Sequence, residues 1–127
     1  MKKALLLIAI ISLSVIWSCD EDVCICDSGP FYGELRVKIT INDENPEVLL
    51  TIMEGNIESQ DTVISEYVNE TNVYYELEAD RYYSAVVGYD QGTRQITAID
   101  GRRMTLSDDD CGCEYADNIT LNLRLAN

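Results

Sequence analysis

The feature that most restricts the fold is an alternation of apolar and polar residues that recurs in short runs between residues 33 and 125. In the first run, Gly33–Asn42, every second residue from Leu35 onward is leucine, valine or isoleucine. Successive side chains of a β-strand point to opposite faces of a sheet, so this pattern predicts a strand with one buried face. No run has a convincing helical period, and we therefore expect an all-β chain.

Similar runs predict further strands, separated by turn-forming Asn, Asp, Gly and Pro residues. The predicted strands cover residues 33–42, 47–54, 62–68, 73–78, 82–89, 93–99, 102–106 and 119–125. Residues 62–68 are the weakest run and are expected at a sheet edge, while Asp90–Gly92 and Asp100–Gly101 are typical turns. Seven to eight short strands at this spacing favour an antiparallel Greek-key β-sandwich.

The order of these strands resembles that of prealbumin-like (transthyretin-like) sandwiches, which occur in many surface modules, including those of Gram-positive adhesins. The resemblance covers residues 33–125 and rests on the strand pattern, not on a diagnostic motif. It implies a single β-sandwich domain over residues 33–127. That length is enough for one modest hydrophobic core.

The N-terminal segment has the composition of an export signal. Lys2 and Lys3 precede an apolar run from Ala4 to Trp17. This run is too short to span a bilayer, which needs about 20 apolar residues. It is typical of the hydrophobic region of a signal peptide.

The run ends at Ile16-Trp17-Ser18-Cys19, which resembles the lipobox of bacterial lipoproteins, although Trp17 stands where a small residue is usual. The resemblance implies that residues 1–18 are removed and that Cys19 becomes an acylated N-terminus carrying diacylglycerol and a fatty acid such as palmitate. The alternative is an ordinary signal peptide with Cys19 as a structural cysteine. Several acyl chains would hold the domain at a membrane.

Residues 19–32 are predicted to be an acidic tether. Its start, Asp20-Glu21-Asp22, resembles the export signal of Bacteroidetes surface lipoproteins. The resemblance implies a lipid-anchored protein of the outer membrane, exposed on the cell surface. The alternative is that these residues are only a solvated spacer, which leaves the periplasmic face open.

The charge of the chain excludes one class of partner. Removal of residues 1–18 takes away two of nine basic residues and none of the 23 acidic ones, so the formal charge changes from −14 to −16. Nucleic-acid binding needs clustered Lys and Arg, so we expect none. Anionic headgroups would also repel the domain, so we expect the acyl chains at Cys19, and not the protein surface, to attach it to the membrane.

Besides Cys19, four cysteines form two Cys-x-Cys pairs, Cys24/Cys26 and Cys111/Cys113. A bridge within such a pair closes a very small ring, so we expect disulfides between the pairs. An exported chain meets an oxidising compartment, which favours bridges over a four-thiolate zinc site. Free thiols are the third alternative.

Carboxylates are concentrated in residues 107–118, which are predicted to form an acidic loop. Four of them are candidate Ca²⁺ ligands: Asp108, Asp109, Asp110 and Glu114. A Ca²⁺ loop needs oxygen donors at alternate positions, and Gly112 falls where a donor belongs. We therefore favour a solvated loop without a metal.

Two surface features suggest contacts or modification. Tyr74 and Tyr82 alternate with Tyr75 and Tyr83 on neighbouring predicted strands, so some rings must be exposed. Exposed tyrosines suit contact with protein or glycan, but we expect core packing to account for most. Asp61-Thr62-Val63 matches a short O-glycosylation pattern of Bacteroidetes exported proteins, with Thr62 as the acceptor.

The chain contains no histidine, which removes Ser-His and Cys-His nucleophile pairs and most catalytic zinc sites. We therefore expect no enzyme and no cofactor apart from the lipid. The preferred hypothesis is a structural or interaction lipoprotein of the cell envelope, similar to fimbria-associated lipoproteins, which contacts envelope proteins through a sheet edge or loops. The alternative is a module that binds glycan or Ca²⁺ through residues 107–118 and nearby tyrosines.

Overall fold

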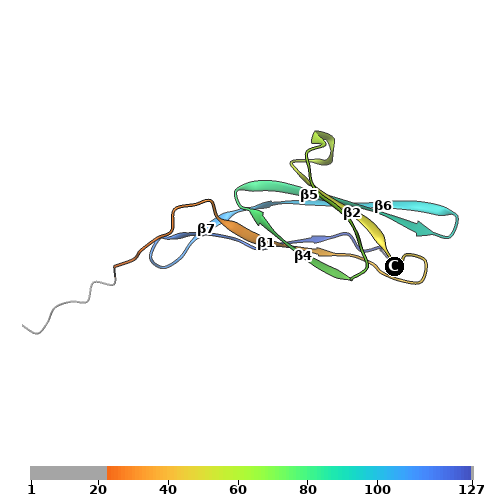
Figure 1. The fold of residues 1–127 in the computed structure, drawn as a ribbon, viewed down its shortest axis with the longest axis horizontal. Coiled ribbons are helices and arrows are strands. Elements are labelled where there is room, and N and C mark those ends of the chain that lie inside the picture. The colour runs from red at the N-terminus through yellow and green to blue at the C-terminus, as the bar shows by residue number, and fades with distance from the viewer. Residues whose placement is uncertain (1–22, 127) are drawn as a thin grey trace, which may run out of the picture.

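The computed structural model describes residues 23–126 (Figure 1). The predicted signal peptide, Cys19 and the residues Asp20–Asp22 lie outside the described residues. The described part contains nine strands and one short 3-10 helix. These are β1 (Tyr32–Lys38), β2 (Val48–Glu54), η1 (Ile57–Ser59), β3 (Thr62–Val68), β4 (Asn72–Glu78), β5 (Arg81–Gln91), β6 (Arg94–Met104), β7 (Leu106–Asp108), β8 (Glu114–Ala116) and β9 (Ile119–Asn122).

The strands form two facing sheets and a small hairpin. One sheet has the order β4-β1-β9 and the other β3-β2-β5-β6, while β7 and β8 pair only with each other. The prediction of an all-β sandwich with antiparallel sheets is confirmed, and β3 lies at a sheet edge as expected. One pairing differs from the prediction, because β1 and β9 run parallel, with Lys38 opposite Asn122.

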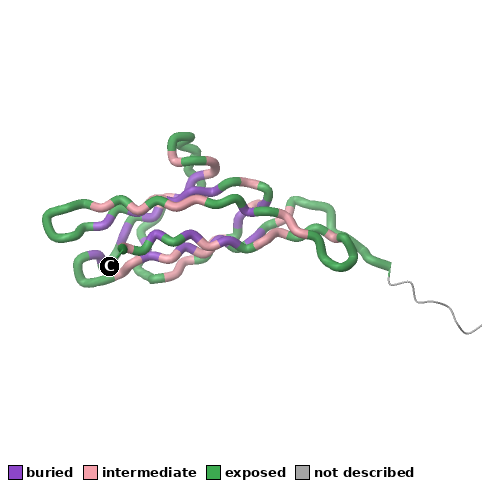
Figure 2. Tube along the Cα trace, turned by 180° about the vertical axis from the view of Figure 1, so that it is seen from behind, coloured by how far each residue is buried: buried purple, intermediate pink, exposed green. Residues whose placement is uncertain are grey.

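The core lies between the two sheets, where the inward side chains of both are buried (Figure 2). In β1 the alternation places Leu35 and Val37 in the core and leaves Arg36 and Lys38 on the outer face. In β5 the same alternation buries Tyr83, Ala85, Val87 and Tyr89. The period of two in the sequence is therefore confirmed in both strands, and in β1 it also identifies the buried face.

The predicted turn at Asp100–Gly101 is wrong, because both residues lie inside the continuous strand β6. The glycine is needed here for packing. The ring of Tyr82, from the neighbouring strand, covers Gly101, and a Cβ at residue 101 would lie 2.9 Å from Tyr82 Cε1. An aromatic ring over a glycine on the adjacent strand stabilises a sheet position that lacks a side chain of its own.

The predicted acidic loop 107–118 is also corrected, since much of it forms the β7–β8 hairpin. Its turn depends on Asp109, whose Oδ1 accepts hydrogen bonds of 2.9 Å from the backbone N–H groups of Cys111 and Cys113. An aspartate that binds nearby backbone amides in this way favours a tight turn. Together with the merging of 93–106 into one strand region, this hairpin explains why nine strands are present and not seven or eight.

Along one side of the sandwich, a carboxylate on the edge strand β3 connects the two sheets. Glu66 is paired with the fully buried Leu50, so its side chain faces inward. The hydroxyl of Tyr75, on β4 of the other sheet, donates a hydrogen bond to Glu66 Oε1. Burial of the ring, together with this contact, raises the pKa of Tyr75. An inward-facing charge on an edge strand discourages pairing with another chain.

The opposite side is closed in the same way by Asp100 on the edge strand β6. Asp100 is paired with the buried Ala85 and therefore also faces inward. Its Oδ1 accepts a hydrogen bond of 2.8 Å from the N–H of Gly101, and its Oδ2 accepts one of 2.8 Å from the N–H of Asn122 in β9. Each edge strand of the four-stranded sheet is thus linked to the three-stranded sheet by a carboxylate side chain of its own.

The sandwich is elongated, with the tether and the β7–β8 hairpin at one end and the C-terminus at the other (Figure 1). We call these the tether end and the distal end. Within residues 23–126, no helix has the length and apolarity needed to cross a bilayer.

Candidate functional site

Two disulfides fix the tether to the hairpin at the tether end. Cys24 is bonded to Cys111 and Cys26 to Cys113, with Cα–Cα distances of 5.7 and 5.1 Å. Each bridge joins residues 87 positions apart. The prediction of bridges between the two Cys-x-Cys pairs is confirmed.

The base of the hairpin is held by Asp117. Its Oδ2 accepts hydrogen bonds from the hydroxyls of Ser107, at 2.6 Å, and Thr105, at 2.8 Å. These two bonds lower the pKa of Asp117, because they stabilise its ionised form. Its N–H also donates to the carbonyl of Thr105 at 2.9 Å. The bridges and this network give the tether a firm attachment to the sandwich.

The outer face of the four-stranded sheet is the most unusual surface of the molecule. Between Asp90 at the distal end and Arg103 at the tether end, none of the described side chains that alternate outward is charged. They are Leu49, Thr51, Met53, Thr62, Ser65, Tyr67, Tyr82, Ser84, Val86, Gly88, Gln95, Thr97, Ile99 and Gly101, of which Met53 and Ser84 are covered by other residues. We call this set the neutral face.

Several apolar side chains of the neutral face are open to solvent. Tyr67 is 68% exposed, Ile99 52% and Leu49 42%. Ser65, Thr51, Val86 and Ile99 lie side by side across the four strands by register. A charge-free row of this kind is notable in a chain with 23 acidic residues and a formal charge of −14. Contiguous exposed surface with few charges is typical of a protein interaction site.

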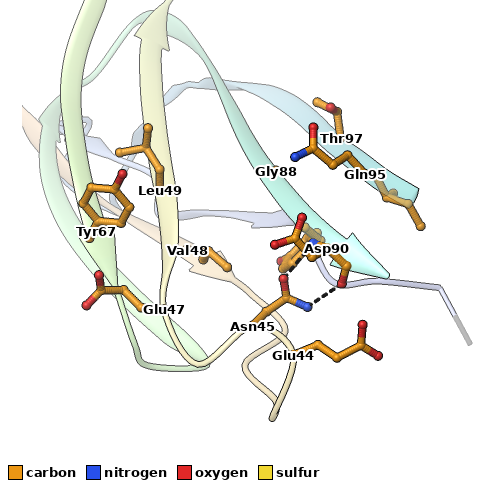
Figure 3. A pocket seen from close by; sticks show the side chains of 12 residues that line it. Glu44, Asn45, Glu47, Val48, Leu49, Tyr67, Gly88, Asp90, Gln95 and Thr97 are labelled. Carbon is orange, nitrogen blue, oxygen red and sulfur yellow. Dashed lines mark hydrogen bonds between the residues drawn. The ribbon is translucent and has the colours of Figure 1, made fainter. Parts of the chain in front are cut away.

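At the distal end of the neutral face, a hollow of about 290 Å³ opens over Gly88 (Figure 3). Leu49 and Tyr67 stand on one side of it, and Gln95 and Thr97 on the other. The hollow exists because residue 88 has no side chain, and a Cβ there would meet nothing within 4 Å. Its floor is therefore strand backbone, and its walls are aromatic, aliphatic and amide groups.

The rim of the hollow is acidic and is fixed by a buried asparagine. Glu44, Glu47 and Asp90 line its outer part. Asn45, which is 4% exposed, donates from Nδ2 to the carbonyl of Asp90 at 2.9 Å and accepts at Oδ1 from the Asp90 N–H at 2.8 Å (Figure 3). This pair of bonds attaches the loop before β2 to the end of β5. The hollow is thus preformed, and its rim disfavours an anionic ligand.

The predicted Ca²⁺ ligands are not brought together. Within residues 23–126, no group of three or more Cys, Asp or Glu side chains is placed to hold a metal ion. The reason is local, because Asp109 Oδ1 already accepts two backbone hydrogen bonds in the turn. Asp108 and Glu114 are opposite each other in the β7–β8 ladder, and Asp110 lies exposed in the turn between them.

The tyrosines are distributed differently from the expectation that most pack in the core. Tyr83 and Tyr89 are buried, and Tyr75 packs against the core from the edge. Five of the eight are exposed, and these are Tyr32, Tyr67, Tyr74, Tyr82 and Tyr115. The expectation is wrong for these five, because they occupy the outward positions of their strands or of the hairpin.

The predicted O-glycosylation acceptor, Thr62, is exposed at the start of β3 and lies opposite Met53. The pairing of β3 with β2 changes register after this point, so that Ile64 lies opposite Ile52 and Val63 is the extra residue of a bulge. Thr62 is therefore accessible at the border of the neutral face.

Sequence reasoning did not find the neutral face or the hollow. Their residues are spread over four strands, and the strand order that unites them is not readable from local pattern. One signal was present: the outward positions of β2 and β5 carry the uncharged residues Leu49, Thr51, Val86 and Gly88, although the chain is strongly acidic.

Comparison of the chain with protein-family models, with curated proteins and with solved structures finds no match in any of the three.

Proposed function

We propose that the protein is a non-enzymatic lipoprotein of the bacterial outer membrane that binds an envelope protein through the neutral face. In this proposal, acyl chains at Cys19 hold the protein at the membrane and the sandwich acts as a structural interaction module. The observation that carries the proposal is the absence of charge on the outer face of β3-β2-β5-β6, among the described residues, in a chain of formal charge −14.

The disulfides support the anchoring part of the proposal. Cys24 follows Cys19 by five residues. Five extended residues span at most about 18 Å, so the bridged tether would hold the tether end close to an anchor at Cys19. A solvated spacer alone would let the domain rotate freely. A bridged one restricts the orientation of the neutral face, which runs along the long axis of the sandwich (Figure 1).

The binding surface we propose is a sheet face, whereas the expectation from the sequence was contact through a sheet edge, by strand addition, or through loops. Glu66 and Asp100 face inward on the two edge strands of the four-stranded sheet and are engaged by Tyr75 and by the Asn122 N–H. Such inward charges disfavour an added strand. The exposed rings and hydroxyls of the neutral face instead suit an uncharged protein surface.

Photo-crosslinking in cells tests the proposal. A photoreactive residue replaces Ile99 on the neutral face, and the matched control carries it at Glu76, which is exposed on the other sheet. We expect one adduct of discrete mass from position 99 and none from position 76. Thr51→Glu, which places a charge beside Val86 in the same row, should remove the adduct. Equal adducts from both positions, or an adduct that survives Thr51→Glu, would contradict the proposal.

A second candidate function rests on the hollow over Gly88. An exposed Tyr67 ring, the Gln95 amide and nearby carboxylates are groups that bind neutral sugars, which revives glycan binding at a different place from loop 107–118. A Cβ at residue 88 would meet nothing within 4 Å, so Gly88→Leu places its side chain in the hollow. If neutral oligosaccharides shift the amide NMR signals of Gln95 and Thr97, Gly88→Leu should abolish the shifts. Shifts that persist in this variant would exclude the hollow as the site.

A further inference from the structure

Three basic side chains gather in one pocket on the outer face of the three-stranded sheet. Arg36, Lys38 and Arg124 line a pocket of about 310 Å³ together with Ile39, Thr71 and Asn72. They are three of only nine basic residues in the chain. Arg36 and Lys38 are successive outward residues of β1, and Arg124 follows β9, which lies beside β1. The fold therefore concentrates positive charge that the sequence separates.

None of these three residues forms an ion pair within the described part of the chain. The ion pairs within residues 23–126 involve Arg81 and Arg103, and none involves the three residues of the pocket. Isolated cations are costly to gather in one place, because like charges repel. No carboxylate lines the pocket, although the chain has 23 acidic residues, and the three cations are therefore available to an anionic ligand.

Neutral amides hold the two guanidinium groups in place. Arg36 donates from Nε and Nη2 to Asn72 Oδ1 at 3.0 and 2.7 Å, and its Cζ lies 5.9 Å from the centre of the Tyr74 ring. Arg124 donates from Nε to Asn122 Oδ1 at 3.0 Å. An amide oxygen orients an arginine without cancelling its charge. Each guanidinium keeps further N–H donors for another acceptor.

We propose that this pocket binds the oxyanion of an acidic sugar, that is, a carboxylate, sulfate or phosphate group. Oriented guanidinium groups match the geometry of such oxyanions, and Lys38 adds a point charge in the same pocket. The uncharged hydrogen-bonding side chains around the cations, Thr71, Asn72 and Asn122, suit sugar hydroxyls. The proposal is independent of the protein partner and of the hollow over Gly88, which lie on the other sheet.

The position of the pocket separates this ligand from the headgroups around the proposed anchor. β1 runs from Tyr32 near the tether to Lys38, and the C-terminus lies at the distal end (Figure 1). The basic pocket is therefore at the end of the sandwich away from the disulfides. A bilayer that holds the tether end would not reach it.

NMR titration of the full-length protein in an uncharged detergent tests the proposal. The signals followed are the Nε–H groups of Arg36 and Arg124. The probes are glucuronate, glucose 6-sulfate, glucose 6-phosphate and uncharged glucose, at constant ionic strength because salt screens such contacts. We expect saturable shifts with at least one anionic sugar and none with glucose. The anionic sugar that binds most tightly identifies the type of oxyanion.

Charge-neutralising variants make the test specific to the pocket. Lys38→Gln and Arg124→Gln should each weaken binding by about tenfold, because each removes a charged donor. Lys38→Arg should retain binding. Arg94→Gln is the matched control, since Arg94 is exposed at the distal end but does not line the pocket. No saturable shift with any anion, or an equal loss in Arg94→Gln, would overturn the proposal. Thr51→Glu, which disrupts the neutral face, should leave sugar binding unchanged. The two proposals can therefore fail independently of each other.

Discussion

The hydroxyl of Tyr89, in β5, donates a hydrogen bond of 2.7 Å to the carbonyl oxygen of Leu123, which follows β9 in the opposite sheet. The same hydroxyl accepts one of 3.0 Å from the N–H of Thr40, which follows β1. Tyr89 is 1% exposed, and burial raises its pKa. One side chain thus joins the two sheets at the distal end, between the hollow and the basic pocket.

Tyr89→Phe should lower the free energy of unfolding by about 1–3 kcal/mol, because it leaves the Leu123 carbonyl and the Thr40 N–H unpaired in the interior. Urea unfolding followed by circular dichroism measures this change. Tyr67→Phe is the control, since Tyr67 is exposed, and its effect should stay within about 0.5 kcal/mol. Equal stabilities of the two variants would mean that the Tyr89 hydroxyl does not tie the sheets together.

The two disulfides should be strongly non-additive. Both close the same loop, with a sequence separation of 87 in each case. Replacing Cys24 and Cys111 by serine should cost about 2 kcal/mol, because the other bridge still closes that loop, and replacing all four cysteines should cost about 6 kcal/mol. Chemical unfolding of the variants gives the comparison. If removing both bridges lowered the free energy of unfolding by only twice as much as removing one, this account would be refuted.

Asp117 should show a low pKa that depends on two hydroxyls. The Ser107 and Thr105 hydroxyls donate to its carboxylate and lower its folded-state pKa below the ordinary value of about 3.9. The ionised form is therefore the stabilised one, so its contribution to stability is complete above pH of about 4 and is lost as the pH falls through the folded pKa. Carboxyl NMR titration should show a larger upward shift of this pKa in Ser107→Ala than in Thr105→Val. Identical titration curves in all three proteins would contradict the assignment.

Asp100→Ala should both destabilise the protein and increase its self-association. The substitution leaves the N–H groups of Gly101 and Asn122 without their acceptor, which costs about 1–3 kcal/mol. It also removes the inward charge from the edge strand β6. Unfolding experiments and size-exclusion chromatography over a range of concentrations measure the two effects. The control is Asp110→Ala in the exposed hairpin turn, which should match the parent protein in both stability and elution.

The sequence predicted the strands well where one face is buried and the other is polar. In β1 the alternation identified Leu35 and Val37 as residues of the buried face. In β5 it gave the strand and its period, but both faces are largely uncharged there, and which face is buried came only from the structure. The sequence-based prediction was wrong where contacts between strands determine the local conformation. From the sequence, Gly101 was predicted to lie in a turn. In the structure it lies within a strand, and the Tyr82 ring of the neighbouring strand covers it.

The candidate sites were less predictable for the same reason. The four cysteines could be paired across the chain from their spacing, because a bridge within Cys-x-Cys is sterically poor. By contrast, the neutral face and the basic pocket combine residues from non-consecutive strands, and Arg124 lies beside Lys38 only because β9 runs parallel to β1. Local pattern contains no information about such a pairing.

The central claim, a disulfide-stapled sandwich tied to a membrane by a lipid at Cys19, is tested most directly by the mass of the tryptic peptide 19–36, released by reduction of its two disulfides from protein in membrane fractions. We predict a peptide that begins at Cys19 and carries diacylglycerol and fatty acid, and its disappearance from membranes in Cys19→Ser. Recovery of the wild-type chain as a water-soluble protein with an unmodified or different N-terminus would contradict the account.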